Sequence, residues 1–246
     1  MNHSSRVAAY SKTDPGLKRP DNQDVCAADL DRGFFMVADG MGGVAGGEVA
    51  SALFLAAVTE TFAGPREPSV DKGRERVHAA FLLANAKIQA HAAATPTHKG
   101  LGCTGELLIL CQDHIVLGHV GDSRTYCFRR GILDRLTIDH SLVQDQVDRG
   151  ILTWEQAERS NLRNVLTRAV GIDAKLIVDI VCRQVQPGDI YLLATDGLHG
   201  MVDEWEILPI LGYDAPLSFK ADILINMAND AGGGDNTSVT LVEILP

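Results

Sequence analysis

The stretch Phe34-Phe35-Met36-Val37-Ala38-Asp39-Gly40-Met41-Gly42-Gly43 joins an unbroken apolar run to an aspartate and a cluster of glycines. Five consecutive apolar residues predict a strand over residues 34–38. Asp39 follows directly, and the glycines after it allow the backbone to turn with positive φ and to approach a ligand closely. The stretch therefore predicts an apolar strand that carries a carboxylate to its end.

The same arrangement occurs at three other aspartates. Asp122 follows a strand-like run, Asp196 follows another and precedes a glycine, and Asp235 stands just before the last apolar run. Asp-Gly is common turn chemistry, which accounts for any one of them alone. Several carboxylates at strand ends repel one another unless a cation neutralises them, and oxygen-only ligands select hard ions such as Mg²⁺ or Mn²⁺. The four together favour a metal site.

Hydrophobic periodicity predicts the other elements. Adjacent, hairpin-like strands with grouped helices favour an α+β layered fold with antiparallel sheets over a doubly wound parallel sheet. The absence of repeats and linkers favours one domain. The remaining predicted elements are strands over residues 107–111, 115–120, 125–128, 177–185, 190–194 and 237–244, and helices over residues 47–62, 72–94, 204–211 and 217–231.

Residues 141–171 form a polar segment between these elements, with arginines at positions 149, 159, 163 and 168. Thr153 with Gln156 has the spacing of a capping box, which predicts the start of a short helix. His140, at the entrance of the segment, is expected to order it.

Composition limits the classes of protein that the chain can belong to. The net charge of the 246 residues is −10, which argues against general binding to nucleic acid. Five cysteines without CxxC spacing indicate reduced core thiols, as in cytosolic proteins. The first ten residues lack a signal-peptide core, and Glu106, Asp113 and His114 interrupt the most apolar stretch. We therefore expect a soluble, cytoplasmic protein with no membrane partner.

Arg19 is a candidate anion-binding residue, because a guanidinium matches the geometry of phosphate. Alone it would be an ordinary surface residue. Together with carboxylates that select hard ions, it indicates metal-assisted hydrolysis of a phosphoryl group.

Eight motifs, in the order of the family, resemble those of metal-dependent protein phosphatases of the protein phosphatase 2C type, in the short single-domain bacterial form. They are Arg19-x-x-Asn22-Gln23-Asp24, Val37-Ala38-Asp39-Gly40-Met41-Gly42-Gly43, Leu101-Gly102-Cys103-Thr104, Val120-Gly121-Asp122-Ser123-Arg124, Leu136-Thr137-x-Asp139-His140-Ser141-Leu142-Val143, Asn164-x-Leu166-Thr167-Arg168-Ala169-x-Gly171, Thr195-Asp196-Gly197-Leu198 and Gly233-Gly234-Asp235-Asn236-x-Ser238.

The resemblance implies a four-layer α-β-β-α sandwich, in which two antiparallel sheets are flanked by helix pairs. It implies one catalytic domain over residues 1–246, with a mobile flap at about residues 141–171. The implied activity is hydrolysis of phosphoserine and phosphothreonine in proteins, by a metal-bridging hydroxide that attacks phosphorus in line. The implied partners are phosphorylated proteins, among them a serine/threonine kinase or its targets in signalling.

The resemblance also assigns the ligands of two core ions, Mn²⁺ or Mg²⁺. Asp39 would bridge both ions, and the Gly40 carbonyl would join it on the second. Asp196 and Asp235 would complete the first ion, and Asp24 would hold the second through water.

Two further assignments follow from the same resemblance. Asp122 with Asp196 matches the pair that binds a third, looser ion in bacterial members. Arg19 would anchor the substrate phosphate, so that Arg19 and Asp39 are the residues expected to carry catalysis.

The chain departs from the family pattern at several positions. Gln23 replaces a glutamate of many eukaryotic members, which predicts weaker metal binding. The histidine proposed as general acid is absent, since Met41 and Val44 occupy the two positions where members carry it. His199 lies near the site in sequence, but a lone histidine is more often structural. Ser238 stands where threonine is usual.

Two other interpretations are weighed against an enzyme of this family. A dinucleotide site at Gly40-x-Gly42-x-x-Ala45 is disfavoured, because Asp39 would point a carboxylate at the pyrophosphate. A catalytically weak regulator that binds phosphopeptides on the same fold would be expected to lack a metal-binding aspartate, and none is missing.

Overall fold

Strand β3 (Phe34–Met41) lies in the interior of the fold, and both of its faces are buried. Phe34 and Met36 pack toward one helical layer, whereas Phe35 and Val37 pack toward the second sheet. This double burial explains why the strand appears in the sequence as an unbroken apolar run.

The predicted end of this strand, after Ala38, is wrong by three residues. The ladder continues because Gly40 and Met41 pair with the short strand β4 (Gly102–Cys103). Asp39 therefore projects from paired backbone, which fixes its position more firmly than a turn would.

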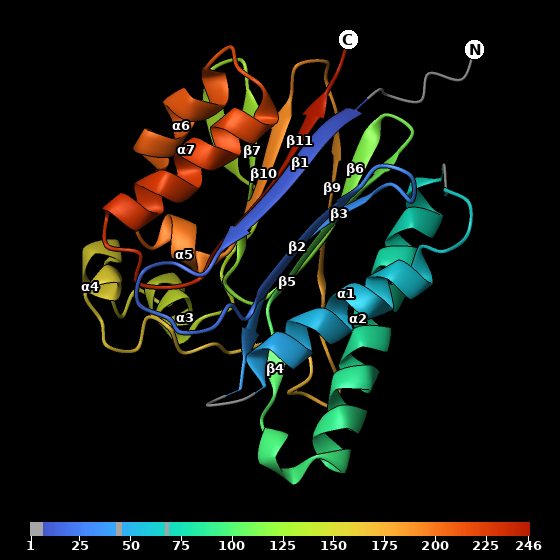
Figure 1. Cartoon of the computed structure of the whole chain (residues 1–246), viewed down its shortest axis with the longest axis vertical. Helices are drawn as coiled ribbons and strands as arrows, with labels where there is room; N and C mark the ends of the chain where they lie inside the picture. Colours follow the sequence, from blue (N-terminus) through green and yellow to red (C-terminus); the bar gives the residue numbers. More distant parts are fainter. Residues whose placement is uncertain (1–6, 43–45, 67–68) are drawn as a thin grey trace.

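The computed structural model describes residues 7–42, 46–66 and 69–246, and two antiparallel sheets form its centre (Figure 1). One sheet has the order β1-β11-β10-β7-β8, and the other has the order β2-β3-β5-β6-β9 with β4 beside β3. Bounds not yet given are β1 Val7–Asp14, β2 Asp24–Asp29, β5 Gly105–Cys111, β6 His114–Val120, β7 Arg124–Arg129, β8 Ile132–Arg135, β9 Asp179–Gln184, β10 Ile190–Ala194 and β11 Thr237–Ile244.

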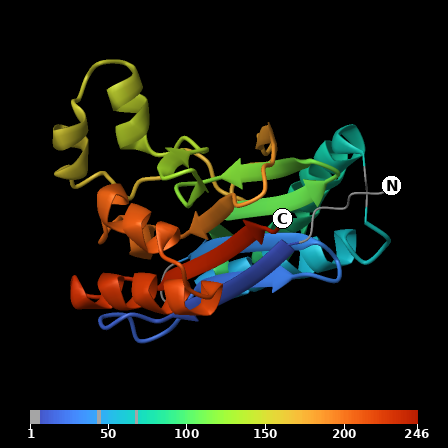
Figure 2. The same ribbon diagram turned by 90° about the horizontal axis from the view of Figure 1, so that it is seen from above.

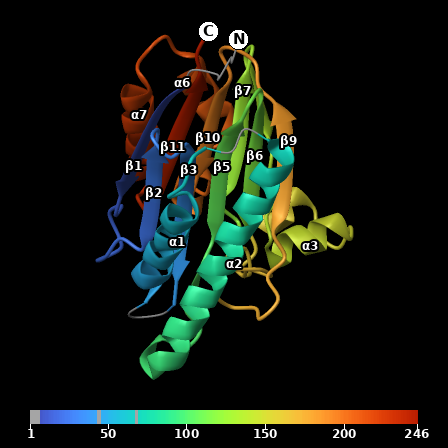
Figure 3. The same cartoon turned by 90° about the vertical axis from the view of Figure 1, so that its right-hand side faces the viewer.

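Helices cover the outer face of each sheet, so the fold has four layers (Figure 1). Figure 3 looks onto the helices that cover the sheet containing β3. Helices α1 (Gly47–Thr61) and α2 (Val70–Ala94) pack on the sheet that contains β3, and η1 (Pro96–His98) follows α2. Helices α5 (Asp196–His199), α6 (Glu204–Gly212) and α7 (Leu217–Asp230) lie on the other sheet. These layers confirm the predicted α-β-β-α sandwich. Within the described ranges no helix is both long enough and apolar enough to cross a membrane.

The polar segment 141–171 contains two short helices, α3 (Leu142–Asp148) and α4 (Trp154–Glu158), which lie beyond the end of the sheets (Figure 2). The predicted capping box is confirmed, because the Thr153 hydroxyl accepts from Gln156 N–H and the Gln156 amide oxygen accepts from Thr153 N–H.

Strands β1, β2, β4 and β8 are missing from the sequence prediction. In β1 most side chains are only half-buried and the apolar alternation is weak. The strand forms because all eight of its residues pair with β11, a long-range contact that local propensity does not reveal.

Two glycines make room for the aromatic side chain that joins α2 to its sheet. Phe81 lies edge-on to Phe54, with ring centroids 5.0 Å apart. A Cβ on Gly118 would lie 2.6 Å from atoms of both Phe81 and Val77, and a Cβ on Gly105 would also meet Phe81. The absence of side chains on the sheet lets the ring pack directly against the backbone.

We expect Gly118→Ala to lower the free energy of unfolding by about 1–3 kcal/mol, because the added methyl group overpacks this contact. Chemical denaturation measures the change. The matched control is Gly64→Ala, whose Cβ would meet only the end of Arg76 at 3.7 Å and which should change stability by less than about 0.5 kcal/mol. Equal stability of the two variants would contradict this packing.

Candidate metal centre

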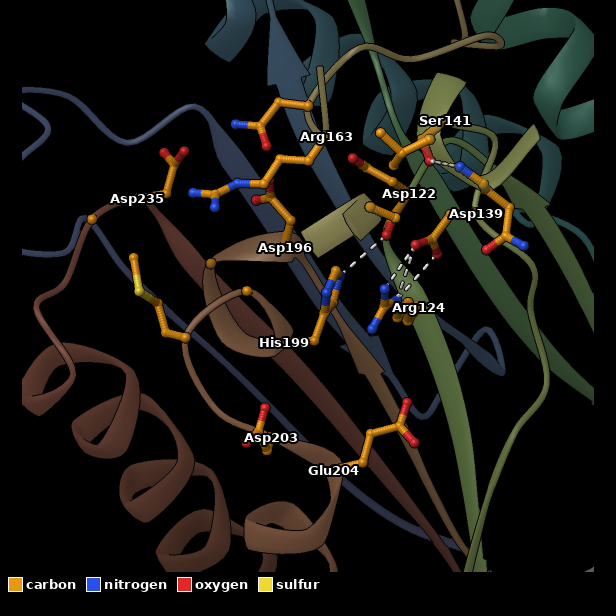
Figure 4. A pocket seen from close by; sticks show the side chains of 18 of the residues that line it. Asp122, Arg124, Asp139, Ser141, Arg163, Asp196, His199, Asp203, Glu204 and Asp235 are labelled. Carbon is orange, nitrogen blue, oxygen red and sulfur yellow. Dashed lines mark hydrogen bonds and ion pairs between the residues drawn. The ribbon is translucent and has the colours of Figure 1, made fainter. Parts of the chain in front are cut away.

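The predicted site residues lie together at one end of the sandwich, although they come from distant parts of the chain. A cavity of about 870 Å³ is lined by Arg19, Asp122, Asp196 and Asp235, together with residues of the segment 141–171 (Figure 4). Figure 4 shows Arg163 reaching from that segment toward Asp196.

Asp24 and Asp39 are direct cross-strand partners in the pairing of β2 with β3. Side chains of such partners lie on the same face with Cβ atoms about 4.5–5.5 Å apart, and like charges there destabilise the sheet. Burial, followed by the charges of Asp196 and Asp235, raises the pKa of Asp24 to about 8, although Thr195 and Ser238 hydrogen-bond its carboxyl group. Burial and the neighbouring Asp24 likewise raise the pKa of Asp39 far above its usual range.

Asp196 extends this pair across to the other sheet. It follows β10, and its carboxyl group lies near enough to that of Asp39 to affect its own pKa. Burial, followed by the charge of Asp235, raises the pKa of Asp196 to about 6. The Thr195 hydroxyl donates to Asp24 at 2.8 Å. The end of β10 therefore provides Asp196 and also contacts Asp24, which belongs to the other sheet.

Asp122 follows β6 on a tightly confined loop. Burial, then the charge of Asp196, raises the pKa of its carboxyl group well above the usual range. The distance between His199 Nε2 and the main-chain oxygen of Asp122 is 3.1 Å. Nε2 must carry the proton of this hydrogen bond, because a carbonyl oxygen only accepts. His199 therefore supports the loop, in agreement with the expectation of a structural histidine.

A pair of hydroxyl groups ties Asp39 to the Asp122 loop. The Thr104 hydroxyl accepts from the Asp39 N–H at 2.9 Å, and it lies 2.7 Å from the hydroxyl of Ser123. Both residues are buried. The motifs contained these residues, but sequence reasoning gave them no role because the contact is between distant strands.

Arg19 forms an ion pair with Asp235, with Nη2 and Oδ2 2.7 Å apart. The guanidinium is about half exposed and lines the cavity. Asn236 anchors the loop of Arg19, since its side chain accepts from Gln23 N–H and donates to the carbonyls of Pro15 and Asp21.

The start of α1 lies against Gly40 at very short range. A Cβ on Gly40 would come within 1.9 Å of the Gly47 oxygen, so only glycine fits there. The side chain of Gln23 reaches Glu48 at 3.5 Å. Glu48 was missed by sequence reasoning; an acidic residue in the first turn after the glycine run was the available signal.

The chemistry of these residues fits a hard divalent cation. The donors are oxygen atoms only, and Oδ1 of Asp24 and Oδ1 of Asp196 are buried without a hydrogen-bond partner. Among the described residues, no three His, Cys, Asp or Glu side chains already enclose a single ion. An ion bound here would complete its coordination shell with water, as Mg²⁺ commonly does.

No general acid is apparent among the candidates considered from the sequence. Met41 has no acidic proton, and the His199 proton is engaged as described above. Val44, the other position considered, lies outside the described residues.

Comparisons with known proteins show which family the chain resembles. A sequence model of protein phosphatase 2C matches residues 16–224. The chain is 35% identical over 242 residues to the serine/threonine phosphatase stp of Listeria monocytogenes, covering 96% of this chain and 95% of that protein.

Two solved structures are similar along almost the whole chain. The serine/threonine phosphatase PstP/Ppp of Mycobacterium tuberculosis has a TM-score of 0.91 and 33% identity, covering 98% of this chain and 99% of that one. The catalytic domain of serine threonine protein phosphatase PstP in complex with 2 manganese ions has a TM-score of 0.89 and 31% identity, with the same coverage of the two chains.

The carboxylate cluster predicts how stability depends on pH after divalent ions are removed with EDTA. An unfolded aspartate titrates near pH 3.9, whereas the pKa of folded Asp196 is about 6 and that of Asp24 about 8. The folded state therefore binds more protons, and this contribution to stability is complete below about pH 4 and is lost as the pH rises through 6 to 8.

We expect the melting temperature of EDTA-treated protein to fall between pH 5.5 and 8.5, and to fall less steeply in Asp39→Asn. The substitution removes one carboxyl group whose pKa is raised far above its usual range. The exposed Asp230→Asn is the matched control and should keep the wild-type slope. An Asp39→Asn slope equal to that of wild type would contradict the raised pKa of Asp39.

Proposed function

The chain belongs to the protein phosphatase 2C family and is a metal-dependent protein serine/threonine phosphatase, and we propose that it hydrolyses phosphoserine and phosphothreonine at the centre around Asp39. The observation that carries this assignment of the site is one cavity that combines an anion-binding donor with acceptors for cations. Arg19 lies 2.7 Å from Asp235, next to the unpartnered carboxylate oxygen of Asp196.

Two core ions, Mn²⁺ or Mg²⁺, would be held by the carboxylates described above. Asp39 and the Gly40 carbonyl, with Asp196 and Asp235, would be direct ligands, and Asp24 would act through water. When bound, these ions supply Lewis acidity, which lowers the pKa of water toward neutrality and offsets the charge of the phosphoryl oxygens. The raised pKa values of Asp24 and Asp196 support this assignment, because they mark carboxylates that lack a compensating cation.

A third, looser ion would be held by Asp122 with Asp196. The charge of Asp196 raises the pKa of Asp122, and both residues line the same cavity.

Arg19 binds and orients the phosphate in this proposal. Its guanidinium offers a planar fork of donors that matches two phosphoryl oxygens, and its pairing with Asp235 sets its direction. A phosphate placed there faces the carboxylate cluster, so the attacking water and the leaving serine or threonine oxygen can lie in line.

No covalent phosphoenzyme is needed for this reaction. Ser141, a hydroxyl residue of the cavity wall, caps α3 by accepting from the Gln144 N–H at 3.2 Å. We propose that water supplies the proton for the leaving oxygen, because Met41 has no acidic proton and the proton of His199 is engaged with Asp122.

Residues 141–171 act as a flap beside the cavity in a single catalytic domain. Support comes from Ser141, Trp154 and Arg163 of this segment, all of which line the cavity. The substrates are phosphoproteins, and a serine/threonine kinase or its targets are the class we propose.

A regulator that only binds phosphopeptides would need the same Arg19 but not the full carboxylate set. All five aspartates are present and gathered at one place, which favours hydrolysis.

The direct test is hydrolysis of a phosphothreonine peptide by wild type, by wild type with EDTA, and by Asp39→Asn, each with Mn²⁺ except in the EDTA arm. We expect release of phosphate by the Mn²⁺-loaded wild type only, with at least a hundredfold loss in the other arms, on the order of the effect of removing a principal catalytic group. Malachite-green detection of phosphate measures the rate.

Arg19→Ala separates phosphate binding from metal binding. It should raise KM for the peptide while leaving Mn²⁺ uptake, measured by calorimetry, intact. Turnover that survives both EDTA and Asp39→Asn would rule out the metal-centred assignment. A wild type that binds the phosphopeptide but releases no phosphate would favour the regulator.

A further inference from the structure

His140 is buried where the chain enters the flap, and both nitrogens of its ring have a partner. The main-chain N–H of Gly121 donates to Nδ1 at 3.1 Å. Nε2 lies 3.1 Å from a carboxylate oxygen of Asp179 on β9. The ring thus bridges the loop after β6 and the edge strand of the same sheet.

These two contacts define the tautomer of the ring. A main-chain amide can only donate, so Nδ1 carries the lone pair and Nε2 carries the proton given to Asp179. Burial, followed by the charge of His119, lowers the pKa of His140 to about 4, in keeping with a neutral ring. Arg168 donates to the other oxygen of Asp179 at 2.8 Å and so fixes the carboxylate.

His140 also holds the backbone of Gly121 from the opposite direction. Its own N–H donates to the Gly121 carbonyl at 2.7 Å, so both main-chain polar groups of Gly121 bond to one residue. Gly121 has a φ of 108°, and a Cβ there would lie 2.6 Å from Thr104. The backbone of Gly121, which immediately precedes Asp122, is therefore conformationally restricted.

Both ends of the flap meet at the same residue. The Thr167 N–H donates to the His140 carbonyl at 2.8 Å, and Ser141 forms an isolated bridge with Leu166. Arg168, at the exit of the flap, reaches the ring of His140 through Asp179. These contacts connect the base of the flap to Gly121 through His140.

We propose that His140 is a positioning residue through which the base of the flap fixes the carboxylate of Asp122, with Asp179 and Arg168 holding its ring. The inference rests on the proposed function, since it concerns the carboxylate assigned to the loosest ion. His140 touches neither substrate nor metal; it acts on Asp122 through the backbone of Gly121.

The test is a double-mutant cycle on Mn²⁺ binding, measured by isothermal titration calorimetry. His140→Leu should weaken the loosest Mn²⁺ by about tenfold, the lower end of the effect of losing an outer partner of a metal ligand. In an Asp122→Asn background, the same substitution should change Mn²⁺ affinity by less than about twofold, because the group that it acts on has gone. Half-saturating Mn²⁺ for hydrolysis of p-nitrophenyl phosphate should follow the same pattern.

A conservative variant and a matched control separate positioning from general damage. His140→Asn keeps an acceptor for the Gly121 N–H and should retain affinity within about threefold of wild type. His114→Leu removes a histidine that pairs with Asp113 on the distant β5–β6 hairpin, and it should bind Mn²⁺ as wild type does.

Wild-type Mn²⁺ affinity in His140→Leu, or equal weakening with and without Asp122, would overturn the proposal. If His140→Leu does not fold, Asp179→Asn takes its place in the cycle, with about threefold weaker binding expected only when Asp122 is present. A wild type that hydrolyses neither a phosphopeptide nor p-nitrophenyl phosphate would contradict the proposed function, whereas calorimetry would still decide the coupling.

Discussion

Repulsion among carboxylates in a confined, poorly solvated space is the constraint on which the rest of this structure depends. Asp24 and Asp39 stand opposite each other on paired strands, and Asp196 and Asp122 approach from two other strand ends. Burial and mutual repulsion raise the pKa of all four, so their charged forms require a compensating cation. The fold holds these groups together at a cost in stability because the site needs them close.

The two sheets each supply part of the centre, which makes the sandwich interface a functional element. β2 and β3 deliver Asp24 and Asp39 from one sheet, and the ends of β10 and β11 deliver Asp196 and Asp235 from the other. The Thr195 hydroxyl bonds Asp24 across the interface at 2.8 Å. Packing between the sheets, led by aromatic and branched side chains, therefore sets the spacing of the carboxylates.

The sequence predicted the elements and residues whose signal is local. Residues 34–38 were recognisable as a strand because burial on both faces leaves an unbroken apolar run, and Asp39 stood out because it follows that run. Strand β1 was not recognisable, since its pairing with β11 comes from the far end of the chain. The contacts of Thr104, Asn236 and His140 were equally hidden, because a hydroxyl, amide or imidazole gains its partner only when distant strands meet.

The central claim is that this carboxylate cluster holds the divalent ions. Anomalous diffraction from crystals soaked in Mn²⁺ tests it most directly, because it locates each ion without reference to activity. The account predicts anomalous peaks in contact with Asp39 and its neighbours Asp196 and Asp235, and their loss in Asp39→Asn. Ordered Mn²⁺ peaks found only elsewhere, with none at Asp39, would contradict it.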